Sequence, residues 1–319
     1  MLLLRLPFLR QPVQGDDYYY LAGAMHALID PAHPTHVRYV FLGQEVDARG
    51  HPHPPLNMWI LAGLLAIFGD VREVPFHAAY VIFSLIAAWS MLALAWRFCA
   101  RPLLACLLFL LVPAFVVNGN SFEADLPLLA FWMASVALFV KAVDEGSPWS
   151  LAGAALALAL AGLLGLQALV LVPILAGYLW LARCWRRSAW AVLSAPLVSA
   201  VAWQTFERVT SGEWPVLILL GHLESFGFQR VEAKLANAIA LTTHAGWLVF
   251  PGLAWLAFWR GPRWIKLLAV ASGGLAALAL DPHPVFWASF ATGVYLLAGL
   301  TLRLWSVDPS SRFSAFWAV

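Results

Sequence analysis

Charged residues are scarce in this chain: they make up 11% of its 319 residues, whereas 62% are apolar. Soluble globular proteins carry about 25% charged and about 45–50% apolar residues. One soluble core cannot bury so large an apolar fraction, so the composition excludes a soluble enzyme, a nucleic-acid-binding protein and a disordered linker. The 19 Lys and Arg nearly balance the 17 Asp and Glu, which gives no support for a polyanionic partner. The chain is therefore predicted to be a polytopic membrane protein.

Cysteine is scarce as well. The three cysteines, Cys99, Cys106 and Cys184, show no metal-ligand spacing and lie in or beside apolar runs. This pattern indicates small core residues and not a disulfide framework.

Long apolar runs are what the chain has instead. A membrane-spanning helix needs about 20 apolar residues, and residues 147–182 would form a helix about 54 Å long, too long for one crossing. That stretch is expected to fold back near Gly162, Gly165 and Gln167. The sequence thus predicts an all-α, polytopic transmembrane helix bundle with about nine spans. They are 74–96, 102–117, 126–143, the two halves of 147–182, 188–203, 236–259, 265–280 and 284–304.

The charges between these spans predict a topology. Most basic residues fall on one side, which the positive-inside rule makes cytoplasmic, and most acids fall on the other. Residues 1–73 are then an exterior N-terminal loop with interfacial helices. Residues 74–319 form the helical bundle, with exterior loops at 118–125 and 204–235. Residues 1–10 are too short to span, so a first helix is expected to be missing ahead of them.

The exterior loops hold the polar residues that could carry chemistry. Asp16 and Asp17 begin a short amphipathic helix expected on the membrane surface, where capping alone could also explain them. Asp125 precedes Leu126-Pro127 and is expected to cap the next span, with Glu123 beside it. Carboxylates at a membrane boundary favour a functional role.

Two further groups of residues have both functional and plain interpretations. The first loop carries several side chains that could hold a metal ion or simply form a solvated loop: His33, His36, Glu45, Asp47, His51 and His53. In the third loop, Arg230 and Lys234 share one helical face. They could bind the phosphate of a lipid carrier, or pair with Glu232 or lipid headgroups.

The order of these motifs resembles a known family. Asp16-Asp17-Tyr18-Tyr19, then His53-Pro54-Pro55-Leu56 before an apolar stretch, is similar to the first loop of the protein O-mannosyltransferase superfamily. The lipid A aminoarabinose transferases have similar loops. Glu123-x-Asp125-Leu126-Pro127 is also similar to that family. The resemblance covers roughly residues 15–140. This chain differs from the family in having Asp16-Asp17 where the family often has Asp-Glu. The helix before the first acidic motif and the exterior C-terminal domain of many members are also not found in this sequence.

The resemblance implies a GT-C membrane glycosyltransferase that takes a sugar from a polyprenyl phosphate. It implies a glycan, lipid or protein acceptor on the exterior face, in the inner membrane of a bacterium. By this analogy Asp16 is the general base and Asp17 its nearest competitor. Asp125, with Glu123, orients the acceptor or helps to bind a divalent ion. His53, Arg230 and Lys234 hold the phosphate, and residues 56–69 help to form the groove for the lipid tail.

Other functions remain open at this point. A transporter or a scaffold subunit is the main alternative, although transporters usually place polar sites near the bilayer midplane, where this chain has few ionisable residues. An inactive, truncated relative is a second alternative. Haem binding is a third, because exterior histidines and tryptophans coexist, but the chain has no c-type attachment motif.

Overall fold

The computed structural model describes residues 2–112, 115–116, 118–228, 230–248, 262–281 and 283–306. The chain divides into two compact units. The first comprises residues 1–110 and 116–223, and the second comprises residues 111–115 and 224–319.

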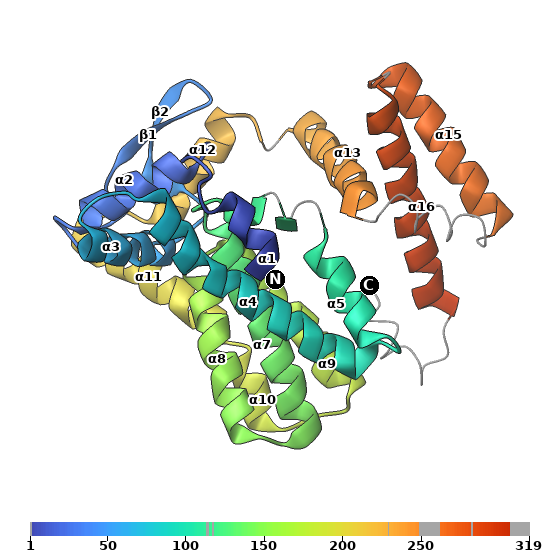
Figure 1. The fold of residues 1–319 in the computed structure, drawn as a ribbon, viewed down its shortest axis with the longest axis horizontal. Helices are drawn as coiled ribbons and strands as arrows, with labels where there is room; N and C mark the ends of the chain where they lie inside the picture. Colours follow the sequence, from blue (N-terminus) through green and yellow to red (C-terminus); the bar gives the residue numbers. More distant parts are fainter. Residues whose placement is uncertain are drawn as a thin grey trace. The chain divides into compact units, whose positions relative to one another are not determined.

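The first unit opens with short elements and then continues as helices (Figure 1). The short elements are α1 (Leu2–Arg5), η1 (Leu6–Phe8), α2 (Asp17–Ala27), β1 (Arg38–Phe41), β2 (Gln44–Asp47), η2 (Ala48–Gly50) and α3 (Leu56–Phe68). The helices that follow are α4 (Glu73–Phe98), α5 (Pro102–Leu110), η3 (Asn118–Asn120), α7 (Asp125–Glu145), α8 (Pro148–Gly162), η4 (Leu166–Val170), α9 (Leu171–Leu181), α10 (Arg187–Val192), α11 (Ala195–Ser211) and α12 (Pro215–Ser225).

Three helical segments among the described residues are long and apolar enough to cross a bilayer. They are α4, α7 and residues 187–211, which comprise α10 and α11. Each corresponds to a predicted span. Among the described residues of the predicted span 102–117, the longest helix is the nine-residue α5, which is about 14 Å long and too short to cross. The predicted span 236–259 lies only partly within the described residues, which stop at residue 248 and resume at residue 262. Helix α13 covers its described part.

The predicted fold-back of residues 147–182 is confirmed. Helix α8 begins at Pro148, where the Ser147 side chain accepts a hydrogen bond from the Ser150 backbone, and it ends at Gly162. The chain then turns through residues 163–165 into η4 and α9. Gly162 allows α8 to pack closely on α11, because a β-carbon there would lie 2.7 Å from the Pro196 carbonyl oxygen.

One β-hairpin interrupts the helical first loop. Strands β1 and β2 pair antiparallel, with Arg38 opposite Asp47 and Phe41 opposite Gln44. The turn places Leu42 and Gly43 at positive φ, a conformation that glycine adopts without strain. This hairpin was not predicted from the sequence. It stands beside α2 (Figure 1), where the Tyr19 and Tyr39 rings lie 4.6 Å apart.

The second unit contains α13 (Val231–Leu248), α15 (Arg263–Ala279) and α16 (Pro284–Ser306). Helices α13 and α16 approach closely through small residues: a β-carbon on Gly293 would overlap the Thr242 backbone, and one on Gly246 would overlap Ser289. Small residues at such contacts let helix backbones pack directly in membrane proteins.

All three cysteines are free. Cys106 is buried, as the sequence predicted, and Cys184 is partly buried. Cys99 is exposed just after α4, so the expectation that it is a core residue is wrong.

Candidate active site

Asp17 joins the first loop to the second. Its side chain is fully buried and accepts hydrogen bonds from two backbone N–H groups, that of Gln14 at 3.1 Å and that of Phe122 at 2.5 Å. Burial raises the pKa of Asp17, and these two hydrogen bonds lower it. Both carboxylate oxygens are therefore occupied in holding the two loops together.

The carbonyl and the ring of Phe122 are bound as well. Its backbone carbonyl accepts a hydrogen bond from the buried Asn57 side chain at 2.7 Å, and the Tyr80 hydroxyl donates to the Asn57 carbonyl oxygen at 2.7 Å. The Phe122 ring is buried against His77, with ring centroids 4.3 Å apart. Since its N–H, its carbonyl and its ring are all bound, Phe122 fixes the position of the second loop just before Glu123.

The N-terminal segment supports the same loop. Arg5 is buried and donates to the Asn120 side chain at 2.9 Å and to the Val116 carbonyl at 3.2 Å. Burial lowers the pKa of Arg5 to about 10. A β-carbon on Gly119 would overlap the Arg5 guanidinium, so glycine is needed at that position for Arg5 to reach the loop.

The two loops bring the predicted carboxylates together at one place in the first unit. Asp16 is exposed at the N-cap position of α2, but its side chain makes no capping hydrogen bond. Asp125 is exposed at the first position of α7, after an Ala124 N-cap, and so it does not cap that helix as predicted. Glu123 is half-buried and hydrogen-bonded to Asp125.

The proximity of these acids changes their chemistry. Burial raises the pKa of Glu123 to about 7, and the charges of Asp125, Asp17 and Asp16 add to the rise. Burial likewise raises the pKa of Tyr20, whose hydroxyl lies among the same charges. Because like charges at close range oppose ionisation, Glu123 is partly protonated near neutral pH.

We expect Glu123→Gln to remove one pH dependence of stability. The ordinary pKa of this side chain is 4.5, whereas burial and neighbouring acids raise it to about 7 in the fold. Between these values the folded state binds more protons, so this contribution is present below pH 4.5 and is lost as pH rises through about 7.

Thermal unfolding of both proteins in one detergent, from about pH 5 to about pH 8, measures this effect. The wild type should lose stability relative to Glu123→Gln as pH rises. Taking the difference between the two proteins removes the titration of groups that do not interact with Glu123. Parallel profiles would contradict the raised pKa.

His53 connects this site to the fold-back turn. Its Nδ1 lies 2.7 Å from the Leu164 carbonyl oxygen, which can only accept, so Nδ1 carries the proton. Backbone hydrogen bonds flank this contact, from Leu166 to Pro52 and from Leu56 to Leu163. Burial lowers the pKa of His53 and favours the neutral ring. Nε2 then accepts, and does not donate, a hydrogen bond.

Comparisons with known proteins agree with this architecture. Residues 52–206 match the family model described as dolichyl-phosphate-mannose-protein mannosyltransferase. The structure resembles a crystal structure of ArnT from Cupriavidus metallidurans bound to undecaprenyl phosphate, with a TM-score of 0.56 and 19% sequence identity over 98% of this chain. The chain spans 60% of the length of that protein. The search of curated proteins found no match to this chain.

The chain has the GT-C fold. This confirms both the predicted fold class and the resemblance that the exterior motifs indicated. With its apolar helices, the GT-C chain is an integral, multi-pass membrane protein. The family match begins at the segment containing His53 and ends within α11, so it covers the fold-back turn and the second-loop acids but not Asp16 and Asp17.

The remaining first-loop histidines of this GT-C chain make other contacts. His33 pairs with Asp30 at 2.8 Å, and His36 pairs with the buried Glu207 of α11 at 2.9 Å. The two acids of the hairpin pair with arginines, Glu45 with Arg38 and Asp47 with Arg49. Within the part of the chain that the structure describes, no group of three His, Cys, Asp or Glu residues is arranged to hold a metal ion.

Arg230 and Lys234 belong to the second unit of the GT-C chain. The Lys234 backbone N–H donates to the Arg230 carbonyl at 3.1 Å, so the two residues lie one helical turn apart, as the spacing predicted. Both are exposed. Their role in holding a phosphate stays a prediction.

Several residues that shape the GT-C site were missed by sequence reasoning. Arg5, Tyr20 and Asn57 were not predicted to be site residues. Tyr20 follows Asp16, the N-cap residue of α2, by four residues, which puts the two about one helical turn apart. A lone asparagine opening the apolar run 56–68 was a usable signal, because a buried amide needs partners.

Proposed function

We propose that this chain transfers a sugar from a polyprenyl-phosphate donor to an acceptor hydroxyl at the exterior face of the membrane. The observation that carries the proposal is the contrast between two adjacent acids. Asp17 is buried and hydrogen-bonded on both oxygens, whereas Asp16 is exposed, forms no cap and lies beside Glu123 and Asp125. Of these two adjacent acids, Asp16 is the one that an acceptor can reach.

In the proposed reaction Asp16 is the general base. The acceptor oxygen attacks the anomeric carbon while its proton passes to the Asp16 carboxylate. The bond from the anomeric carbon to the phosphate oxygen breaks, and its electron pair leaves with the phosphate. The products are the glycosylated acceptor and polyprenyl phosphate. Asp125 accepts a hydrogen bond from the acceptor and orients it, and Glu123 supports Asp125.

The remaining predicted residues have binding roles in this proposal. Neutral His53 has its Nδ1 proton committed to Leu164, so its Nε2 cannot donate to a phosphate and instead accepts from a sugar or acceptor hydroxyl. This differs from the phosphate role that the resemblance implied. Asp17 acts as a positioning residue. Cations stabilise a phosphate leaving group, and we assign that role to Arg230 and Lys234 from charge alone.

The charges between the predicted spans support an exterior location for the reaction. The basic residues between the spans favour a cytoplasmic location for the opposite face, which places the reaction in the periplasm if the host is a bacterium. The acceptor is a glycan, lipid or protein with a free hydroxyl.

We expect replacement of Arg230 and Lys234 by Gln to weaken donor binding about tenfold to a hundredfold, since a charge-assisted contact contributes roughly 1.5–3 kcal/mol. Folding should be unaffected because both side chains are exposed. Binding of a polyprenyl-phosphate sugar to the purified protein measures the effect. The matched control is Arg183→Gln with Arg187→Gln, which removes two exposed charges elsewhere. Equal, small losses in both double variants would mean that Arg230 and Lys234 contact only lipid headgroups.

A further inference from the structure

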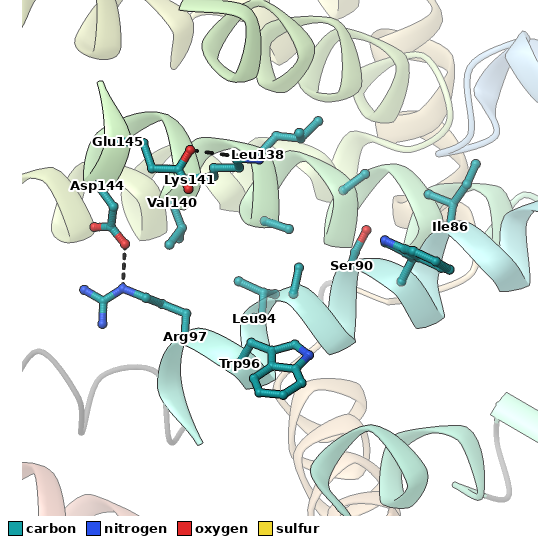
Figure 2. A pocket seen from close by; sticks show the side chains of 14 residues that line it. Ile86, Ser90, Leu94, Trp96, Arg97, Leu138, Val140, Lys141, Asp144 and Glu145 are labelled. Carbon is teal, nitrogen blue, oxygen red and sulfur yellow. Dashed lines mark hydrogen bonds and ion pairs between the residues drawn. The ribbon is translucent and has the colours of Figure 1, made fainter. Parts of the chain in front are cut away.

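A groove runs between α4 and α7, away from the carboxylates. Its volume is about 680 Å³, within the range of about 300–1,000 Å³ that is usual for small-molecule sites. Its walls are mostly apolar, with Ile86 and Leu94 on α4 and Leu138 on α7. Figure 2 shows that the charged side chains gather at one end of the groove while Ile86 lies toward the other.

The charged end lies far from the candidate active site along the helix. Asp125 is the first residue of α7, and Asp144 and Glu145 are its last two. A helix of 21 residues is about 31 Å long, which matches the thickness of a bilayer core. The carboxylate site and the charged end of the groove therefore lie at opposite membrane faces, and the groove is not part of the proposed transfer site.

The charges at this end come in both signs. Arg97 pairs with Asp144 at 2.5 Å, and the Tyr178 hydroxyl also donates to Asp144 at 3.2 Å. Lys141 and Glu145 lie farther apart, at 3.9 Å, and are more than half exposed. That separation exceeds hydrogen-bond length, so the Lys141 ammonium can bind an anionic oxygen and Glu145 can bind a cation.

We propose that this groove binds a zwitterionic phospholipid. One acyl chain lies along the apolar walls, the phosphate contacts Lys141, and the cationic amine contacts Glu145. The charge at the mouth selects this ligand, because two cations and two anions balance there. An anionic lipid has no cationic group to pair with Glu145, whereas Asp144 is already paired with Arg97. Trp96, which lines the groove near the end of α4 and is 66% exposed, suits the amphipathic boundary where tryptophan gathers in membrane proteins.

Native mass spectrometry of the purified full chain, titrated with single lipids, tests the proposal. The probes are phosphatidylethanolamine, phosphatidylglycerol and a polyprenyl phosphate. We expect phosphatidylethanolamine to bind most tightly. Lys141→Gln with Glu145→Gln should weaken it about tenfold or more, since two charge-assisted contacts are lost. Ala93→Trp should also weaken it, because Ala93 lines the groove and is exposed there.

The control is Arg38→Gln with Glu45→Gln. This ion pair on the hairpin is equally exposed, at 64% and 63%, with a distance of 3.2 Å, and its loss should leave lipid binding unchanged. Tighter binding of phosphatidylglycerol or of the polyprenyl phosphate would overturn the assignment. So would unchanged phosphatidylethanolamine binding in either groove variant. If Ala93→Trp fails to fold, the exposed Lys141 and Glu145 pair still decides the question.

Discussion

Asp16→Asn is expected to lose about 10²–10⁴-fold in the rate of sugar transfer, the usual cost of removing a general base. The asparagine keeps the size of the side chain and its ability to cap a helix, but it cannot take a proton from the acceptor. Since the Asp16 side chain makes no capping hydrogen bond and is exposed, the melting temperature should not change. Transfer from a polyprenyl-phosphate sugar in proteoliposomes measures the rate.

The matched control for this variant is Asp70→Asn. Asp70 is an exposed acid just after α3, and its side chain bonds only to the following backbone N–H among the hydrogen bonds described. Its substitution should leave transfer unchanged. Normal turnover by Asp16→Asn would move the base to Asp17, Glu123 or Asp125. Normal turnover after separate substitution of all four acids would remove the chemistry from these loops.

Asp17→Asn is expected to damage the fold and the activity together. The buried carboxylate accepts from two backbone N–H groups, and an amide has only one oxygen. Whichever way the asparagine is oriented, its NH₂ group faces one of those donors. Leaving a buried polar group without a partner costs about 1–3 kcal/mol. The second loop should loosen, and transfer should fall because Glu123 and Asp125 are no longer held beside Asp16.

Two measurements separate this positioning role from catalysis. Hydrogen exchange at the Phe122 backbone should accelerate in Asp17→Asn and stay unchanged in Asp16→Asn. The melting temperature should drop in the first variant alone. If Asp17→Asn keeps the stability and the exchange of the wild type but loses transfer, Asp17 itself is the base and our assignment of the two acids must be reversed.

Sequence reasoning predicted the parts of this structure that composition and length control. The apolar stretch 147–182 had to fold back because no bilayer is thick enough for it, and the break after Gly162 followed. The loop acids and His53 were proposed as site residues from their order along the chain. Their association follows from the fold, since Asp17 contacts Phe122, a residue 105 positions away.

The division of roles within the acid pair could not be predicted from the sequence. Adjacent residues at a helix start point about 100° apart, so one faces the core and the other faces outward. Which one is buried depends on the backbone N–H groups of Gln14 and Phe122, which donate to Asp17. The sequence around the two acids does not predict the contact with Phe122. The hairpin was missed for a similar reason: its four-residue strands are too short for their alternation to stand out.

The hydrogen bond from His53 to Leu164 also limits how early the site can be completed during synthesis of the chain. These residues are separated by 111 positions, and at about 5–20 residues per second their synthesis is about 6–22 s apart. During that interval the first loop has been synthesised, but the Nδ1 of His53 does not yet have the Leu164 carbonyl as its hydrogen-bond partner. A chain that ends before residue 164 would contain Asp16, Asp17, Glu123 and Asp125 but would lack the fold-back turn that binds His53.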